Sequence, residues 1–200
     1  PARDAAIAAY REMYAGNTQD FPREAGSADY AERMKAAYPI HPEMFDRLYE
    51  DWSTLERFQR TRGVLRLLSA VIHRLWQDND QSLLIMPGFL PLWSPSVRNE
   101  MTRYLPDVWP AIIDADIDGE GSRPLQIDQT VPALGQRQAA RRVARAVFLA
   151  SAPASGQDKA RGAEEVRIRL AVLQPGEPAA LFGDALRRMT QQLMYLYNDG

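Results

Sequence analysis

The strongest helical pattern in this 200-residue sequence is GVLRLLSAVIHRLW, residues 63–76. Val64, Leu68, Val71 and Leu75 are spaced three or four residues apart, so they form one apolar row along an α-helix. A row of this length is stable only when it is buried against other elements. The pattern therefore predicts a core helix that begins just after the glycine of this stretch, and it favours a mainly α-helical fold.

Helical spacing also occurs on both sides of this stretch. It predicts helices near residues 4–15, 27–37, 42–52, 96–105, 137–150, 163–173 and 179–192. Ser27 can cap the second of these helices, and Pro42 suits the first turn of the third. Within the sixth, residues 166–170 alternate strictly, which is also typical of a strand, but an apolar row that continues to Leu173 favours a helix.

Composition divides the chain into three regions. Residues 1–81 hold the helices around the central stretch and are predicted to form one helical subdomain. Residues 82–132 are interrupted by prolines, so we expect a connector with a short helix and then a long loop from Asp114 to Pro132. Residues 133–200 hold the remaining helices.

The third region ends in a pattern typical of a β-hairpin. Residues 194–197, MYLY, indicate a strand, and Asn198-Asp199-Gly200 indicates a tight turn. Helix, turn, helix and strand is the order of a winged-helix module, so residues 133–200 are predicted to be a winged-helix-like subdomain cut in its wing. The missing return strand predicts that the chain is a fragment of a longer protein, and a frayed tail is the alternative.

Composition also excludes several classes of site. Cysteine is absent, which excludes disulfides, thiol catalysis and cysteine-bound metals. The formal net charge of −2 provides no general attraction to nucleic acid or anionic lipid. Without a long apolar run or a signal-peptide pattern, we expect no membrane partner and a cytoplasmic location. His41 and His73 lack carboxylates at ligand spacing, so each is interpreted as a helix-end or surface residue.

One loop resembles the first half of a calcium-binding EF-hand. Asp114, Asp116 and Asp118 alternate before Gly119, as the first ligands of such a loop do. The match then fails, because Leu125 stands where a bidentate glutamate is required. Cation binding by residues 114–125 therefore competes with the plainer interpretation, a solvated turn.

Arginines form two further candidate surfaces. Arg137, Arg141 and Arg145 recur every four residues with Arg142 beside them, and such a row either contacts phosphates or an acidic partner, or forms a solvated helix face. Arg187 and Arg188 lie on the polar side of the last predicted helix, together with Gln191 and Gln192. In a winged-helix module that helix reads DNA, although many such modules dock partner proteins instead.

Three more arginines lie at the entrance of the central helix. Arg60, Arg62 and Arg66 surround its start, and helix N-termini and arginines both favour phosphate. Ordinary capping and surface charge are the alternative on spacing alone. No phosphate-loop, Gly-x-Ser-x-Gly or HExxH sequence is present, so the residues do not predict a nucleotide-hydrolysing or hydrolase site in this chain.

Several segments together resemble a known family. They are YPIHPEMF (38–45), WSTL (52–55), FQRTRGVLRLL (58–68), AARRVAR (139–145), QPGE (174–177), FGDALRR (182–188) and YLY (195–197). They are similar to the bacterial AAA+-type ATPases catalogued as domain of unknown function 499, and the resemblance spans most of the chain. Members of that family are large and are associated with phage-defence and DNA-modification gene neighbourhoods.

The resemblance implies a role for this chain within a larger ATPase. The nucleotide-binding core, with its phosphate loop, ATP and Mg²⁺, would lie N-terminal to the chain, which holds no cofactor itself. The chain would be the helical AAA+ lid followed by the winged-helix-like subdomain. Its Gly63-Val64-Leu65-Arg66 is similar to the Gly-x-Pro-Arg start of a sensor-2 helix, with Leu65 in place of the proline. Arg66, with Arg62 as second choice, would then sense the γ-phosphate.

Three functional hypotheses follow for the chain. The first is a non-catalytic lid and winged-helix fragment that couples ATP binding and hydrolysis to conformational change, with the ATPase core of the same chain as its partner. The second is a winged-helix adaptor that binds DNA or a partner protein and has no nucleotide role. The third is a purely structural helical domain.

Overall fold

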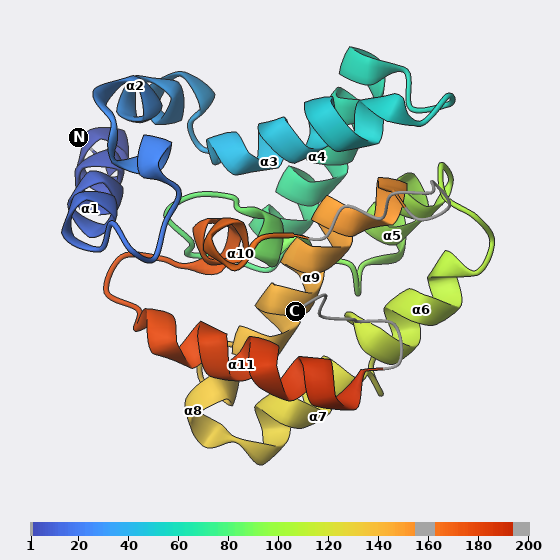
Figure 1. Cartoon of the computed structure of the whole chain (residues 1–200). Coiled ribbons are helices and arrows are strands. Elements are labelled where there is room, and N and C mark those ends of the chain that lie inside the picture. Colours follow the sequence, from blue (N-terminus) through green and yellow to red (C-terminus); the bar gives the residue numbers. More distant parts are fainter. Residues whose placement is uncertain (1, 155–162, 194–200) are drawn as a thin grey trace.

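The computed structural model describes residues 2–154 and 163–193, and these residues fold into packed helices (Figure 1). The prediction of a mainly α fold is confirmed: the described residues contain no β-strand, only an isolated bridge between Ile40 and Ile85. The α-helices are α1 (Ala2–Gly16), α2 (Ala28–Ala37), α3 (Pro42–Asp46), α4 (Arg60–Gln77), α5 (Pro95–Thr102), α6 (Trp109–Asp116), α7 (Arg123–Thr130), α8 (Pro132–Gly135), α9 (Ala139–Ser151), α10 (Glu165–Val172) and α11 (Ala179–Gln192). No helix in these two ranges is long and apolar enough to span a membrane.

Helix α9 occupies the centre of the molecule (Figure 1). It packs against α7, α8, α10 and α11, and against the short 3-10 helix η4 (Pro87–Phe89). Four of its buried residues are alanines, which let neighbouring helices approach closely, while Val143, Phe148 and Leu149 fill the space between them. This arrangement makes α9 the element on which the other helices are positioned.

The N-terminal helices pack through aromatic side chains. Tyr10 and Tyr14 of α1 and Tyr30 of α2 are buried, and the rings of Tyr14 and Tyr30 meet edge to face at 6.2 Å. The predicted cap of α2 is confirmed, because the Ser27 hydroxyl accepts a hydrogen bond from the Tyr30 amide at 3.1 Å.

The helix predicted over residues 42–52 is divided into three pieces. It comprises α3, a π-helical turn η2 (Arg47–Asp51) and a 3-10 turn η3 (Trp52–Thr54). The change of pitch accompanies the burial of Trp52, whose indole Nε1–H donates to the Leu149 carbonyl of α9 at 2.8 Å. Tertiary packing therefore outweighs the regular helix that local spacing predicted.

Helix α4 begins one turn earlier than predicted. It starts at Arg60, after Gln59 in a left-handed conformation, so Gly63 lies inside the helix rather than before it. A Cβ atom at Gly63 would lie 2.0 Å from the Phe58 carbonyl oxygen. Glycine is required here because it lets the incoming chain pass closely against the first turn.

The prediction of a long loop from Asp114 to Pro132 is wrong. Helix α6 extends to Asp116, and helices α7 and α8 follow at residues 123–130 and 132–135. The prolines of residues 82–132 mislead because several of them lie in the first turn of a helix, where the missing amide hydrogen has no cost.

The helices predicted near 163–173 and 179–192 are confirmed as α10 and α11. The alternation at residues 166–170 therefore belongs to a helix and not to a strand. The strand and hairpin turn predicted at residues 194–200, and with them the wing, lie outside the described residues.

Candidate functional site

The two arginines predicted to sense phosphate lie on the exposed side of α4. Arg62 is in the first turn and Arg66 in the second, one turn later than the sequence predicted. Arg66 Nη2 donates to Glu100 Oε1 of α5 at 2.9 Å, and Arg103 shares the same carboxylate at 3.1 Å. Arg62 makes no ion pair with any side chain that the structure describes. The fold thus brings both guanidinium groups to one face.

The two arginines predicted to bind nucleic acid are neighbours on α11. Both contact Asp184, one turn earlier on the same helix, with Arg188 Nε at 2.9 Å. The Arg187 side chain is largely exposed and that of Arg188 partly so. These pairs lower the pKa of Asp184, chiefly through its hydrogen bond from Arg188. Asp184 therefore neutralises one of the two positive charges on this helix.

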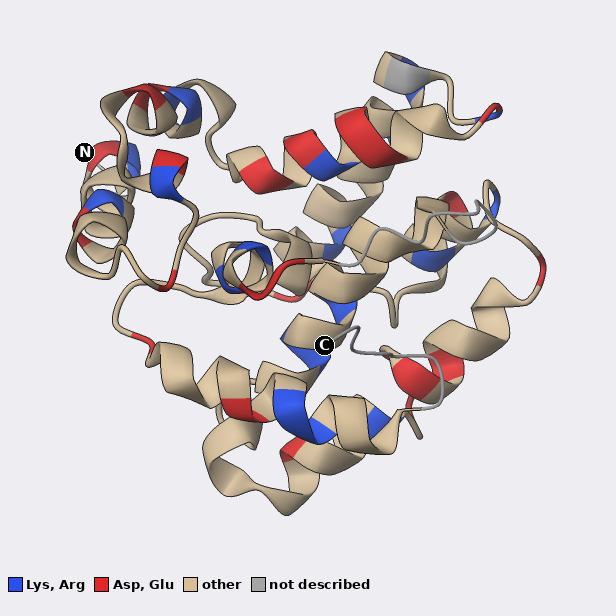
Figure 2. Cartoon of the chain, in the orientation of Figure 1, with Lys and Arg blue, Asp and Glu red and all other residues tan. Residues whose placement is uncertain are grey.

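The arginine row of α9 is an internal network rather than a solvated face. Arg145 is only 2% exposed, and its Nε and Nη2 donate to the two oxygens of Asp118 at 2.9 and 2.7 Å. Arg141 Nε donates to the same carboxylate at 2.9 Å. Figure 2 shows the basic positions of α9 in the middle of the molecule. The two arginines therefore share a carboxylate inside the molecule. Both interpretations that exposed the row to solvent or to a ligand are wrong for Arg145, whereas Arg141 is partly exposed.

Aromatic rings and a second carboxylate complete this network. The Arg145 guanidinium lies 4.7 Å from the centre of the Trp93 ring. Arg142 pairs with Glu177 at 2.8 Å and lies 4.4 Å from the Phe89 ring. Cation–π contacts and buried ion pairs both require excellent geometry to offset desolvation. The arginines of α9 thus bind the segments that contain Phe89, Trp93, Asp118 and Glu177 to this helix.

The aspartates of the EF-hand-like segment take part in structure rather than in a cation site. Asp118 accepts from the α9 arginines, and Asp114 Oδ1 lies 2.8 Å from Arg98 Nη1. Asp116 and Asp118 are buried, so the alternative of a solvated turn is also wrong. Among the described residues, no group of three or more His, Asp or Glu side chains could hold a metal ion.

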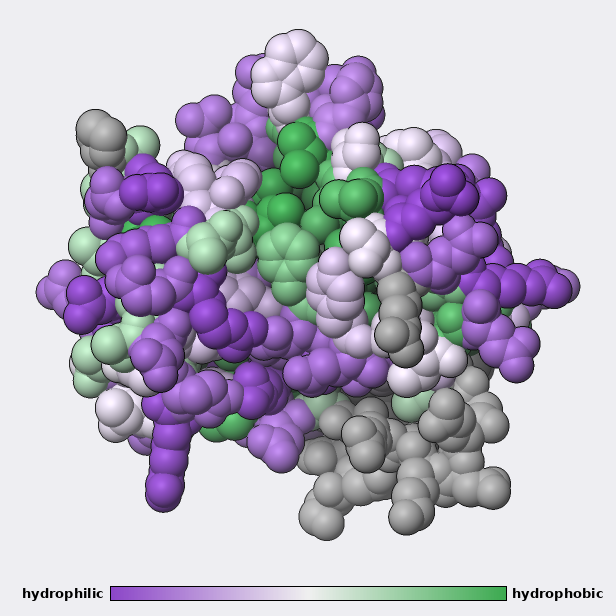
Figure 3. Space-filling model, turned by 90° about the horizontal axis from the view of Figure 1, so that it is seen from above, coloured by the Kyte–Doolittle hydropathy of each residue, from purple (hydrophilic) through white to green (hydrophobic). Residues whose placement is uncertain are grey.

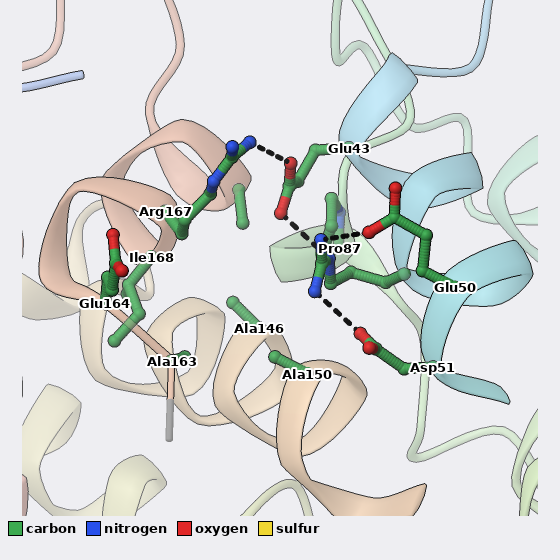
Figure 4. Close-up of a pocket in the computed structure, with 12 residues that line it drawn as sticks. Glu43, Glu50, Asp51, Pro87, Ala146, Ala150, Ala163, Glu164, Arg167 and Ile168 are labelled. Carbon is green, nitrogen blue, oxygen red and sulfur yellow. Dashed lines mark hydrogen bonds and ion pairs between the residues drawn. The ribbon is translucent and has the colours of Figure 1, made fainter. Parts of the chain in front are cut away.

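A cavity of about 290 Å³ lies between α3, η2, α9 and α10 (Figure 4). Its floor is made largely of alanines, and its walls are charged. The charged lining residues are Glu43, Arg47, Glu50, Asp51, Glu164 and Arg167. Sequence reasoning did not single out this cluster, because its members come from segments far apart in the chain.

Glu43 lies at the centre of the charged wall and is buried. Its Oε1 lies 3.1 Å from Arg47 Nε, and its Oε2 accepts from Arg167 Nη1 at 3.2 Å (Figure 4). Burial raises the pKa of Glu43 to about 7, although the two guanidinium groups oppose the shift. The carboxyl group therefore joins α3 to α10 and titrates near neutral pH.

His41 fixes the start of α3, the helix that carries Glu43. It caps α3, because its Nδ1 accepts the Glu43 amide hydrogen at 3.2 Å. Burial lowers the pKa of His41 to about 3, so the ring is neutral and its single proton lies on Nε2. Nε2–H then donates to the Tyr14 hydroxyl at 2.9 Å. The helix-end interpretation of His41 is confirmed and the surface interpretation is wrong, whereas His73 is exposed on α4.

Comparison with known families decides the relationship of the chain. A family model described as the DUF499 second domain matches residues 13–177. The chain belongs to the DUF499 family. Neither a curated protein nor a solved structure matches it.

Only one of the two groups of arginines lies within the region that matches the DUF499 second domain. Arg62 and Arg66 lie inside the matched region, as do Glu43 and its partners. Helix α11, with Arg187 and Arg188, begins after the matched region ends. Within the DUF499 domain, the YPIHPE segment is accounted for by local structure: it caps and starts α3 and places Glu43 in the cavity.

Proposed function

We propose that this chain is a non-catalytic helical module of a large cytoplasmic AAA+-type ATPase, acting in phage defence or DNA transactions. In this proposal the ATPase core of the same protein binds ATP and Mg²⁺. The module contributes Arg66 to the γ-phosphate, with Arg62 as second choice. Loss or gain of that contact would couple nucleotide state to movement of the helices.

The position of Arg66 carries the proposal. Its side chain is about half exposed, and the apolar row of α4 packs on the other side of the helix. Its partner Glu100 keeps a second guanidinium, that of Arg103, when Arg66 moves away. An exposed ion pair of this kind contributes at most about 1 kcal/mol, so a phosphate can compete for the arginine.

The test compares two arginine variants of α4 in the full-length protein. Arg66→Ala should lower the rate of ATP hydrolysis by about 10³-fold, because a sensing arginine stabilises charge on the transferred phosphoryl group. Its melting temperature should stay near that of the wild type, since exposed substitutions change stability by about 0.5 kcal/mol. Arg66→Lys should not restore the rate fully, because an ammonium group lacks the planar two-pronged contact.

The matched control is Arg74→Ala. Arg74 lies two turns further along α4 and pairs with Asp78 of the helix terminus at 2.7 Å. Like Arg66→Ala, this variant removes one positive charge from α4, but the rate of ATP hydrolysis should be unchanged. Wild-type turnover by Arg66→Ala would refute the sensing role, and a large loss of melting temperature would assign Arg66 to the fold instead. The isolated chain, which has no phosphate-loop sequence, is expected not to hydrolyse ATP.

The adaptor hypothesis takes second place because Asp184 already holds both arginines of α11. If Arg187 and Arg188 contact DNA phosphates, the full-length protein should bind duplex DNA less tightly as salt rises. Replacing both by Ala should then flatten the salt dependence by roughly one unit per lost contact. Equal binding by the double variant would leave partner docking as the adaptor role.

A further inference from the structure

The cavity between α3, η2, α9 and α10 has more carboxylates than guanidinium groups in its walls. Three carboxylates share Arg47, whose nitrogens lie 3.1, 3.1 and 2.7 Å from Glu43, Glu50 and Asp51. Arg167 is shared too, because it pairs with Glu43 and with a second glutamate. The pKa of Glu43 is raised to about 7 despite both guanidinium groups, because burial outweighs them. A further positive charge in the cavity would therefore be favourable.

One carboxylate of the lining has no guanidinium partner. Glu164 comes directly before α10, is exposed, and forms no ion pair with any side chain that the structure describes. Figure 4 shows Glu164 on the α10 side of the cavity, and Glu50 and Asp51 on the η2 side. Negative charge therefore lies on both sides of the cavity.

The floor between these carboxylates is apolar. Ala146 and Ala150, one turn apart on α9, lie between the two sides (Figure 4). Among the described residues, no group of three or more His, Asp or Glu side chains could hold a metal ion, so the carboxylates do not converge on one point. A single small cation cannot contact both sides, whereas an elongated molecule with a cation at each end can.

The cavity differs from the exposed apolar surface of the molecule. Leu65, Ile72 and Trp76 form an apolar stripe along α4 and are 63%, 43% and 76% exposed. Figure 3 shows a hydrophobic region bordered by hydrophilic side chains on the upper side of the molecule, where α3 and α4 lie in Figure 1. The cavity instead has an apolar floor between charged walls, which favours an aliphatic molecule with charged ends.

We propose that this cavity binds a short aliphatic diamine, with one ammonium group at Glu164 and the other at Glu50 and Asp51. Its methylene groups would lie over Ala146 and Ala150 and be removed from water there. The cavity of about 290 Å³ has the volume of about ten water molecules, so a four-carbon diamine fits with a few waters. A molecule with a negative group is disfavoured, because it would meet the same carboxylates. The site goes beyond the proposed contact with ATP and does not depend on it.

The experiment measures binding of putrescine, a four-carbon diamine, to the full-length protein by isothermal titration calorimetry at low salt without nucleotide. Butylamine has the same chain with one ammonium group, and we expect it to bind about tenfold more weakly. Glu164→Gln should weaken putrescine binding about tenfold, because one end of the diamine loses its partner. It should leave butylamine unchanged, because a single ammonium group would bind at the η2 side, where carboxylates are more numerous.

The matched control is Glu165→Gln. It removes the same charge one residue later, from a side chain that pairs with Arg169 and does not line the cavity. Both affinities should be unchanged in this variant.

A second variant tests the cavity itself. Ala150 is partly exposed, so Ala150→Leu should fill the floor while the protein stays folded, and both amines should no longer bind. Ala36→Leu, at an exposed position of α2, is its control and should bind both amines as the wild type does. If Ala150→Leu does not fold, the comparison of Glu164→Gln with Glu165→Gln decides.

Three results would overturn the proposal. They are putrescine binding no tighter than butylamine, putrescine binding that Glu164→Gln or a folded Ala150→Leu leaves unchanged, and tighter binding of a lysine blocked at both backbone ends. The last result would assign the cavity to a lysine side chain of a polypeptide. Arg66→Ala should leave putrescine binding unchanged, and Glu164→Gln should leave ATP hydrolysis unchanged, so failure of one proposal is distinguishable from failure of the other.

Discussion

Replacing Asp118 by Asn should destabilise the fold severely. Asp118 is buried and accepts hydrogen bonds from Arg145, Arg141 and the Trp93 amide. Asparagine keeps the shape of the side chain but removes its negative charge. Arg145 would then remain buried with its full charge, and the Gly88 carbonyl, 3.3 Å from Nη1, is a weak substitute for a carboxylate.

The size of the loss follows from the burial of both partners. Removing one member of a buried ion pair costs about 3–5 kcal/mol, because the other charge stays desolvated without compensation. For a chain of this length each kcal/mol corresponds to about 2–4 °C, so the melting temperature should fall by roughly 6–20 °C. The measurement is urea and thermal unfolding at pH 7, followed by circular dichroism and tryptophan fluorescence.

Two further variants make this prediction specific. Asp114→Asn removes a neighbouring aspartate whose side chain is exposed and pairs with Arg98, and it should cost at most about 1 kcal/mol. Adding Arg145→Met to Asp118→Asn removes the stranded charge and should recover part of the loss. If Asp118→Asn unfolds within 1 kcal/mol of Asp114→Asn, the α9 network does not stabilise the fold as argued.

Two other substitutions test the charged cavity and the start of α4. The pKa of Glu43 is about 7 in the folded protein against an ordinary 4.5, so its contribution to stability is complete below pH 4.5 and is lost as the pH rises through 7. Glu43 should therefore lower the free energy of unfolding by about 3 kcal/mol between pH 4.5 and pH 7.5. The Glu43→Gln variant should not show this decrease in urea unfolding, and identical pH profiles for the two proteins would contradict the buried-carboxyl argument. Gly63→Ala should destabilise the protein by more than 1 kcal/mol in the same assay, because the new Cβ would meet the Phe58 carbonyl, whereas Gly16→Ala, with no atom within 4 Å, should be neutral or stabilising. Equal stability of the two glycine variants would show that the Phe58 carbonyl can move aside.

Helix positions are predictable here because they depend on short-range spacing. The last helix was expected at residues 179–192 and is observed over the same residues. Ser27 caps α2 as its type and place predict. The loop predicted from Asp114 to Pro132 was wrong because proline both interrupts helices and occurs in their first turn. The spacing of prolines in the sequence does not distinguish these two positions.

The roles of charged residues were much less predictable. Arg66 and Arg145 both recur at helical positions beside apolar residues, yet Arg66 is half exposed and Arg145 is buried. The difference depends on Asp118, which is 27 residues from Arg145, and on Trp93. A pattern read along one helix contains no information about which carboxylate the fold brings to it.

The sequence by itself therefore determined that the chain is helical, where most helices lie and which family it resembles. These properties rest on local periodicity, on capping and on short recognisable segments, all of which are visible in the sequence without knowledge of the packing. Tertiary structure alone decided that the α9 arginines are internal, that Glu43 meets Arg167 from 124 residues away, and that α4 keeps an uncovered apolar stripe. Burial sets the energy of a charge or an apolar surface, and burial is a property of the packed helices together.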